Sequence, residues 1–235
     1  MYLDKINIIY IHPPKTGGTF IENNLFNATS EKKTLNEGFS DAENMFGIEG
    51  KYTKQKHQTL KEYKKNMPEK VYINSKILIS VREPLDRLIS YYFNAADRKN
   101  QKTFKLVKNI NTFTMKYFKK HFFRNYFYKY YQPEYTEKDF INFINYTHNQ
   151  IDFLKINNDI IKPNYIINFS TLKKDLNTFL NEYQISLDQK INQRFNEKKY
   201  NFDIETIKSN KNIINALKNS HHLKDYDYFS FWSKP

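Results

Sequence analysis

Ile6-Asn7-Ile8-Ile9-Tyr10-Ile11, followed at once by His12-Pro13-Pro14-Lys15-Thr16-Gly17-Gly18-Thr19, is the stretch that decides the fold. The first six residues form a nearly continuous apolar run rich in β-branched side chains, which is typical of a buried parallel strand. The residues up to Gly18 predict a loop, and Thr19 to about Phe26 predicts a helix. A strand, a glycine-containing loop and a helix in this order indicate the first unit of an α/β fold.

The pattern of a core strand followed by a helix returns twice. Residues 76–81 form a second apolar run, and residues 85–98 predict a helix that starts just after a proline. Residues 165–169 predict a third strand, and residues 171–183 predict the helix after it. Strands that alternate with helices pair in parallel and carry helices on their faces. We therefore expect an α/β fold of three layers, with a central parallel sheet flanked by helices.

Composition excludes several kinds of site. The 235 residues include no cysteine, so disulfides, thiolate nucleophiles and cysteine zinc sites are excluded. No linker rich in Ser, Gly or Pro divides the chain, and we expect a single domain over residues 1–235. The chain has no run of about 18 apolar residues and no signal-peptide pattern, so we expect no transmembrane segment and a soluble, cytoplasmic protein. The formal net charge of +13 favours anionic partners.

The loop after the first strand has the features of an anion site. The first N–H groups of a helix lack an intrahelical acceptor and carry the positive end of the helix dipole. We expect Gly17 and Gly18 to let the backbone approach an oxyanion closely. Lys15 adds a positive charge, and the hydroxyls of Thr16 and Thr19 are expected to donate to the anion. The loop is not a G-x-x-x-x-G-K-[ST] phosphate loop, because its lysine precedes the glycines.

Arg82 follows the second strand as Lys15 follows the first. Ligands of parallel sheets bind at the carboxyl ends of the strands, so we expect these two cations to serve one site. Arginine offers a bidentate fork for an oxyanion. Ser90 lies about two helical turns into the following helix and offers a hydroxyl donor. For Arg87 we favour a structural ion pair, with Glu83 as the candidate partner.

Two motifs carry a resemblance to a known family. Pro14 to Thr19 resembles the 5′-phosphosulfate loop of the sulfotransferases that use 3′-phosphoadenosine 5′-phosphosulfate (PAPS), and Arg82 to Tyr92 resembles their 3′-phosphate motif, R-x-P-x-x-R-x-x-S-x-Y. The resemblance implies a P-loop-like fold, PAPS as donor, adenosine 3′,5′-bisphosphate as product and no metal. It also implies roles for individual residues in donor binding: Lys15, Thr16, Gly17, Gly18, Thr19 and Phe20 at the 5′ end, and Arg82 and Ser90 at the 3′-phosphate.

The same resemblance implies a catalytic base. Related sulfotransferases often carry a catalytic histidine between the two motifs, and His57 is the only histidine in that interval. A histidine titrates near neutral pH and suits removal of a proton from a hydroxyl. Lys15 would then stabilise the departing phosphate. Glu62 is the alternative base, since some heparan-type relatives use a glutamate, and a solvated surface histidine is the alternative reading of His57.

The acceptor is less well defined. The likeness is closest to the carbohydrate branch, including the heparan and chondroitin types, which implies a glycan hydroxyl; a small molecule or a protein tyrosine stays open. Residues 98–131 hold ten Lys or Arg, no acidic residue and many Tyr and Phe. This composition suits an anionic sugar chain, or equally a helix with its aromatic side chains facing a core. A nucleic-acid-binding role for the segment is ranked low, because it leaves both anion motifs unexplained.

The resemblance extends into the C-terminal half. His148-Asn149-Gln150 is similar to a family segment that contains His and Gln. Residues 193–198 are similar to the late loop that closes over the nucleotide, which implies phosphate contacts for Arg194 and Lys198; a solvated basic loop is the alternative. The adjacent His221 and His222 cannot face one way on a helix, so we expect them at the surface. The sequence carries no signal for an oligomeric state.

Overall fold

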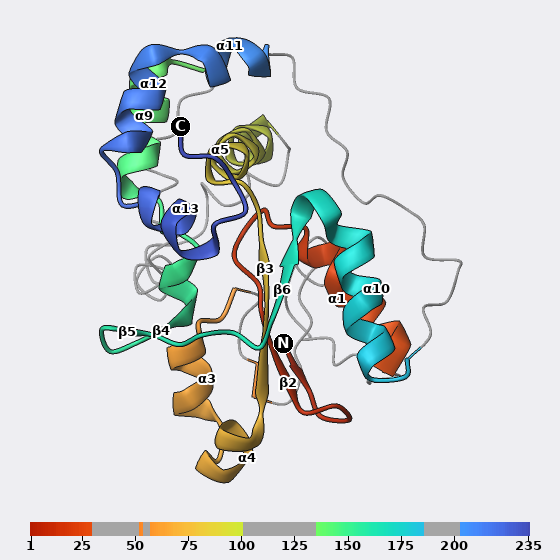
Figure 1. Ribbon diagram of the computed structural model, residues 1–235. Helices are drawn as coiled ribbons and strands as arrows, with labels where there is room; N and C mark the ends of the chain where they lie inside the picture. The colour runs from red at the N-terminus through yellow and green to blue at the C-terminus, as the bar shows by residue number, and fades with distance from the viewer. Residues whose placement is uncertain (30–51, 54–56, 101–134, 186–202) are drawn as a thin grey trace. The chain divides into compact units, whose positions relative to one another are not determined.

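The computed structural model describes residues 1–29, 52–53, 57–100, 135–185 and 203–235 (Figure 1). The chain divides into two compact units. The first consists of Met1–Glu83 and Gln150–Lys198, and the second of Pro84–Asn149 and Lys199–Pro235. Each unit has a hydrophobic core of its own. The expectation of a single domain over residues 1–235 stays a prediction.

A four-stranded sheet with the order β1-β2-β3-β6 forms the centre of the first unit. Its strands are β1 (Tyr2–Leu3), β2 (Ile8–Ile11), β3 (Lys76–Val81) and β6 (Tyr165–Asn168). β2 pairs in parallel with β3, and β3 with β6, while β1 is antiparallel to β2 at the edge. The three parallel strands are those that the apolar runs predicted. β1 was missed because two residues are too few to carry a pattern.

Helices cover both faces of this sheet (Figure 1). α1 (Gly18–Thr29) and α10 (Leu172–Glu182) lie together on one side, and α3 (Leu60–Asn66) lies on the other. Apolar side chains spaced three or four residues apart on α1 and α10 form one core with side chains from one face of the strands: Ile21, Leu25, Leu176, Phe179, Ile8, Tyr10, Leu78 and Ile167. The mixed α/β fold with a central sheet flanked by helices is therefore confirmed.

Short elements complete the first unit. They are α4 (Glu69–Asn74), η1 (Ile151–Leu154), the antiparallel β4–β5 pair (Lys155–Ile156 with Asp159–Ile160) and η2 (Phe169–Thr171). η2 connects β6 directly to α10, so the chain passes beside the loop of residues 12–18 just after it leaves the sheet.

The described part of the second unit is helical. It consists of α5 (Pro84–Asn100), α9 (Glu137–Tyr146), α11 (Ile204–Ser209), α12 (Lys211–Lys218) and α13 (Leu223–Phe229). The sequence of residues 203–219 also predicts one helix, and the structure divides it at Asn210. The Asn210 side chain accepts from the backbone N–H groups of Asn212 and Ile213, so it caps a new helix there.

Buried polar side chains bind backbone carbonyls in the second unit. His222 is fully buried, with Nε2 3.0 Å from the carbonyl oxygen of Ile144, and the expectation that it lies at the surface is wrong. The helical-spacing rule does not apply to this pair, because both histidines precede α13. Arg87 is also fully buried and donates to the carbonyl of His148 at 2.6 Å, which gives it a structural role.

Candidate functional site

The loop between β2 and α1 carries two residues in the left-handed backbone region. Lys15 has a φ of 70° and Gly17 a φ of 84°. This conformation costs a lysine roughly 1–2 kcal/mol, and such strain persists where the surrounding structure imposes it, often at functional sites. The N–H groups of Phe20 and Ile21 both donate to the carbonyl of Gly17, at 3.0 and 3.3 Å, so helical bonding begins there. In a helix the N–H groups at the very start point out of the helix end, and this is the arrangement that oxyanion binding uses.

Both glycines of the loop are required by contacts within the protein. A Cβ on Gly18 would lie 1.7 Å from Nε2 of His12. A Cβ on Gly17 would lie 2.5 Å from Cδ1 of Leu172 and 3.0 Å from Cδ2 of Phe169. The sequence suggested that the missing Cβ atoms clear space for an anion. In the structure the space beside Gly18 is occupied by the His12 ring, and the space beside Gly17 is occupied by side chains of the η2–α10 junction.

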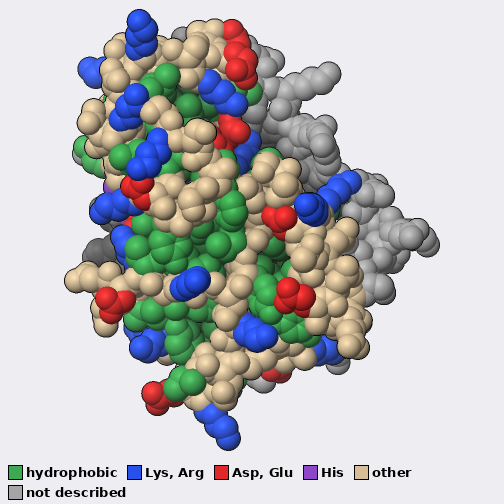
Figure 2. Space-filling view, in the orientation of Figure 1, with side chains coloured by type: hydrophobic (Ala, Val, Ile, Leu, Met, Phe, Trp, Pro, Cys, Tyr) green, Lys and Arg blue, Asp and Glu red, His purple; other side chains and the backbone are tan. Residues whose placement is uncertain are grey.

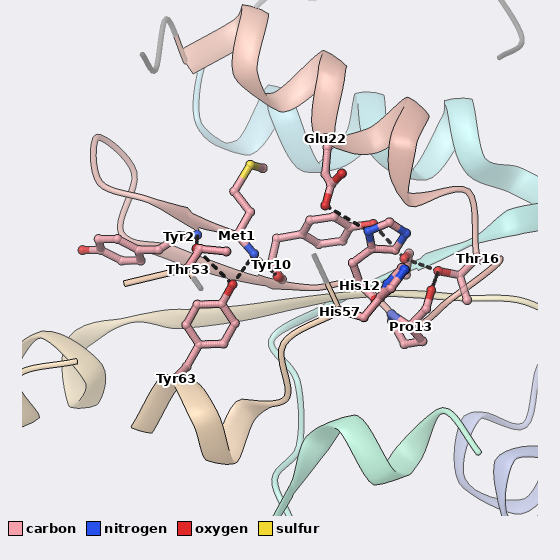
Figure 3. Close-up of polar contacts among 11 residues, drawn as sticks. Met1, Tyr2, Tyr10, His12, Pro13, Thr16, Glu22, Thr53, His57 and Tyr63 are labelled. Carbon is pink, nitrogen blue, oxygen red and sulfur yellow. Dashed lines mark hydrogen bonds and ion pairs between the residues drawn. The ribbon is translucent and has the colours of Figure 1, made fainter. Parts of the chain in front are cut away.

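A chain of hydroxyl groups runs beneath the loop (Figure 3). Thr16 Oγ1 donates to the carbonyl of Pro13 at 2.8 Å and lies 2.7 Å from Ser80 Oγ, which lies 2.8 Å from Tyr10 Oη. Because each hydroxyl has one proton, the order of donation is Tyr10 to Ser80 to Thr16 to Pro13. The Thr16 side chain is fully buried, and its hydroxyl holds the loop through the carbonyl of Pro13; a contact of Thr16 with the donor stays a prediction.

Thr19 and Phe20 form the first turn of α1, and both are half-buried. The Phe20 ring packs against the core between α1 and the sheet, and its N–H donates to Gly17. The ring and the backbone N–H of Phe20 thus both stabilise the fold of the loop. A contact of Phe20 with the donor stays a prediction. Thr19 remains the candidate hydroxyl donor of this turn.

His57 lies against the start of the loop (Figure 3). Its Nδ1 is 2.8 Å from the carbonyl oxygen of His12, and the two imidazole rings meet edge-on with centroids 4.6 Å apart. A carbonyl oxygen can only accept, so Nδ1 of His57 carries the proton. In the neutral ring Nε2 then holds the lone pair, which is the tautomer that a general base needs.

Glu22 holds His12 in turn. Oε1 of Glu22 is 2.9 Å from Nδ1 of His12, and both side chains are 4% exposed. The His12 ring also stacks on Tyr10, with centroids 5.9 Å apart. Burial and the nearby charge of Glu22 raise the pKa of the Tyr10 hydroxyl well above its ordinary value, so this group stays protonated as the first donor of the hydroxyl chain.

Glu62, the alternative base, takes part in a helix cap. Thr59 precedes α3, and its backbone N–H and hydroxyl both donate to Oε2 of Glu62, at 2.7 and 2.9 Å. The Thr59 hydroxyl also accepts from the Glu62 N–H, which completes a capping box. This geometry gives Glu62 a structural role at the start of α3.

Arg82 stands at the carboxyl end of β3 and reaches the loop that follows β2. Its guanidinium lies 4.2 Å from the ring centroid of Phe169, and Nη1 is 3.5 Å from the carbonyl oxygen of Lys15. Its backbone N–H and carbonyl are both bonded to the side chain of Gln150, at 2.8 and 2.9 Å. The two cations predicted for one site therefore lie at the same edge of the sheet.

The remaining predicted site residues stay predictions. Ser90 lies on α5 in the second unit and is 5% exposed, and its shared binding of a phosphate with Arg82 stays a prediction. Arg194, Lys198 and residues 101–134 lie outside the described residues, so the predictions for them also stand as made.

The described surface shows no concentrated charge on the face in view. Lys and Arg side chains are spread over it, with Asp and Glu among them (Figure 2). Within the described ranges, His, Asp and Glu side chains form no group of three or more that could hold a metal ion. No helix in those ranges combines the length and apolar character needed to cross a lipid bilayer.

Comparison with known proteins decides the family. A family model described as the sulfotransferase family matches residues 1–229, which include both motifs, the sheet and the helices α1 to α13. The chain belongs to the sulfotransferase family. It is therefore a transferase that moves sulfuryl groups, and the predicted membership of a sulfotransferase family is confirmed. No curated protein and no solved structure matches the chain.

Sequence reasoning assigned no positioning role to several residues that hold the loop after β2 and Arg82 in place. A hydrogen-bonding role of Ser80 could have been predicted, because a polar residue within a buried apolar strand needs a partner. His12 stands at the end of the first strand, but nothing in its neighbourhood points to Glu22 as its partner. Gln150 is 68 residues from Arg82, and no local pattern reveals that contact.

Proposed function

We propose that this sulfotransferase moves the sulfuryl group of PAPS to a hydroxyl, and that the acceptor is a carbohydrate. The observation that carries the proposal is the meeting of Lys15 and Arg82, from two strands, at one loop, with 3.5 Å between Nη1 of Arg82 and the carbonyl oxygen of Lys15. Two cations beside a helix start suit a ligand with two separate anionic groups. A 3′-phosphorylated donor has them, and this favours PAPS over ATP.

The chemistry needs a base, an attacking oxygen and a stabilised leaving group. The acceptor hydroxyl loses its proton to Nε2 of His57 as its oxygen forms a bond to sulfur. The bond between sulfur and the bridging oxygen breaks, and its electron pair stays on the 5′-phosphate. Lys15 stabilises that charge, and the products are a sulfate ester and adenosine 3′,5′-bisphosphate. The carbonyl of His12 supports this role by keeping the proton of His57 on Nδ1.

The geometry supports His57 over Glu62 as the base. The carboxylate of Glu62 accepts two hydrogen bonds from Thr59, so it is engaged in the cap of α3. The Nδ1–H of His57 donates to the carbonyl of His12, so the lone pair of the neutral ring lies on Nε2, the nitrogen that would accept the proton.

Binding of adenosine 3′,5′-bisphosphate tests the donor. At a hundredfold excess over its dissociation constant we expect the midpoint of thermal unfolding to rise by about 5 °C or more. Lys15→Ala and Arg82→Ala should each remove most of the shift. Lys61→Ala, at an exposed position of α3, is the matched control and should keep it. No shift of the wild-type protein at millimolar ligand would contradict the proposal.

Transfer of labelled sulfate from PAPS across acceptors tests the acceptor class. The panel contains sulfated and unsulfated glycans, small alcohols, simple phenols and a tyrosine peptide. We expect labelled product with glycans. Labelling confined to phenols or to the peptide would retain the donor assignment and overturn the carbohydrate assignment.

A further inference from the structure

We propose that Gln150 is a positioning residue that fixes Arg82 for the 3′-phosphate of the donor. The inference rests on the proposed function, because it takes Arg82 as a ligand of that phosphate. Gln150 lies directly before η1, and its side chain is fully buried. It is 68 residues away from Arg82 along the chain, yet it contacts the Arg82 backbone twice.

The backbone of Arg82 lies just beyond the paired part of β3. The last residue of β3 in register is Val81, which is paired with Asn168 of β6, and Ile79 is the last one paired with Ile11 of β2. Arg82 therefore lies beyond the last paired residue of β3 on the side of β2 and on the side of β6. A strand end without a neighbouring strand has backbone groups that need other partners.

The amide of Gln150 takes the place of a neighbouring strand. Its Oε1 accepts from the N–H of Arg82 at 2.8 Å, and its Nε2 donates to the carbonyl of Arg82 at 2.9 Å. One side chain thus satisfies the donor and the acceptor of the same residue. This pairing also settles which end of the amide is oxygen and which is nitrogen, since the reverse orientation would oppose two acceptors and two donors.

The guanidinium of Arg82 is held separately from its backbone. It stacks on Phe169 at 4.2 Å and approaches the carbonyl oxygen of Lys15 at 3.5 Å. With the backbone fixed by Gln150 and the guanidinium resting on Phe169, the long side chain has little freedom left to lose when a phosphate binds. Preorganisation of this kind increases affinity without a new contact to the ligand.

Glutamine is the side chain that meets both demands at this position. Glutamate keeps the acceptor for the Arg82 N–H but offers a second acceptor to the Arg82 carbonyl. Leucine has a similar shape and satisfies neither group. If Gln150 acts through Arg82, either substitution should weaken recognition of the 3′-phosphate and leave the rest of the nucleotide bound as before.

The test compares two ligands by isothermal titration calorimetry. Adenosine 3′,5′-bisphosphate carries the 3′-phosphate, and adenosine 5′-monophosphate lacks it. For Gln150→Leu we expect about a tenfold loss of affinity for the first ligand, from the loss of two hydrogen bonds that fix the arginine, and less than about a twofold change for the second. Equal loss for both ligands, or no loss for either, would overturn the inference.

A double-mutant cycle separates positioning from a general structural effect. Arg82→Ala should abolish the preference for the 3′-phosphate, and adding Gln150→Leu to it should weaken binding no further. Additive losses would show that Gln150 acts independently of Arg82 and would overturn the inference. If Arg82→Ala itself leaves the affinity for adenosine 3′,5′-bisphosphate unchanged, the proposed function fails instead, so the two failures are distinguishable.

Gln150→Glu is the second variant, for the case in which the leucine variant does not fold. It preserves size, polarity and one of the two hydrogen bonds, and circular dichroism checks its fold. We expect the same selective loss for the 3′-phosphorylated ligand. A folded Gln150→Glu protein with wild-type affinity for both ligands would contradict the role of the glutamine.

Discussion

The ends of β2 and β3 each present one cation to the site, and they are held in place by different kinds of contact. The loop after β2 is held by residues close to it in the sequence, with His12 bound to Glu22 and Thr16 bound to Pro13, and also by Ser80 and His57 from farther along the chain. Arg82 at the end of β3 is held by Gln150 and Phe169, which are far from it along the chain. The first region therefore combines local and distant contacts, whereas the contacts described for Arg82 are all with residues distant in the sequence.

The largest effect should come from Gly18→Ala. The new Cβ would overlap the His12 ring, so we expect a loss of about 3 kcal/mol in the free energy of unfolding, measured by urea denaturation. His12→Ala removes the obstructing ring, and the double variant should lose less than the sum of the two single losses. A Gly18→Ala protein as stable as wild type would show that the loop is not closed on His12.

Glu22→Leu should weaken the same loop by a different route. It leaves Nδ1 of His12 buried without its carboxylate acceptor, and we expect a loss of about 2 kcal/mol in the free energy of unfolding. Glu69→Leu, at an exposed position on α4, is the matched control and should change stability by less than about 0.5 kcal/mol. Equal effects of the two substitutions would argue against a role for the His12–Glu22 pair.

Substitutions of Thr16 and Thr19 should distinguish a residue that stabilises the loop from a residue that binds the donor. Thr16→Val removes the hydroxyl that bonds Pro13 and Ser80, and we expect a loss of about 1 kcal/mol in stability with little change in affinity for adenosine 3′,5′-bisphosphate. Thr19→Val should lower the affinity for adenosine 3′,5′-bisphosphate and change the stability little. Calorimetry and urea denaturation of both variants check the pair, and a large loss of affinity in Thr16→Val would contradict the inward role of its hydroxyl.

The smallest effect is expected for Phe169→Leu. Phe169 lies beneath the Arg82 guanidinium and beside Gly17, so it touches both regions of the comparison. Loss of the cation–π contact should cost about 0.5–1 kcal/mol, seen as a two- to fivefold weaker affinity for adenosine 3′,5′-bisphosphate. Phe231→Leu, at an exposed aromatic side chain of the second unit, should leave the affinity unchanged. Equal affinities of the two variants would show that Phe169 does not support binding of the ligand by Arg82.

The sequence predicted the parts of the fold and site that depend on local pattern. The strands at residues 76–81 and 165–169 were recognised because a buried parallel strand is a continuous apolar run, and Lys15 and Arg82 because each follows such a run. Contacts between distant residues leave no such trace. The bonds of Gln150 to Arg82, of Ser80 to Thr16 and of His57 to the carbonyl of His12 depend on how the sheet is assembled.

Local pattern also misled in two places. His222 was expected at the surface, but it is fully buried, with Nε2 bonded to the carbonyl of Ile144. The helix predicted over residues 203–219 was too long, because Asn210 is compatible with a helical pattern and its preference for capping decides the outcome only with the backbone in place.

Turnover of a His57→Asn variant tests the central claim most directly. Asparagine can still donate to the carbonyl of His12 but has no nitrogen that accepts a proton, so the loop should stay intact while the base is lost. We predict unchanged affinity for adenosine 3′,5′-bisphosphate and a loss of at least about a hundredfold in transfer of labelled sulfate from PAPS to the best acceptor. Transfer by His57→Asn at the wild-type rate would contradict the account.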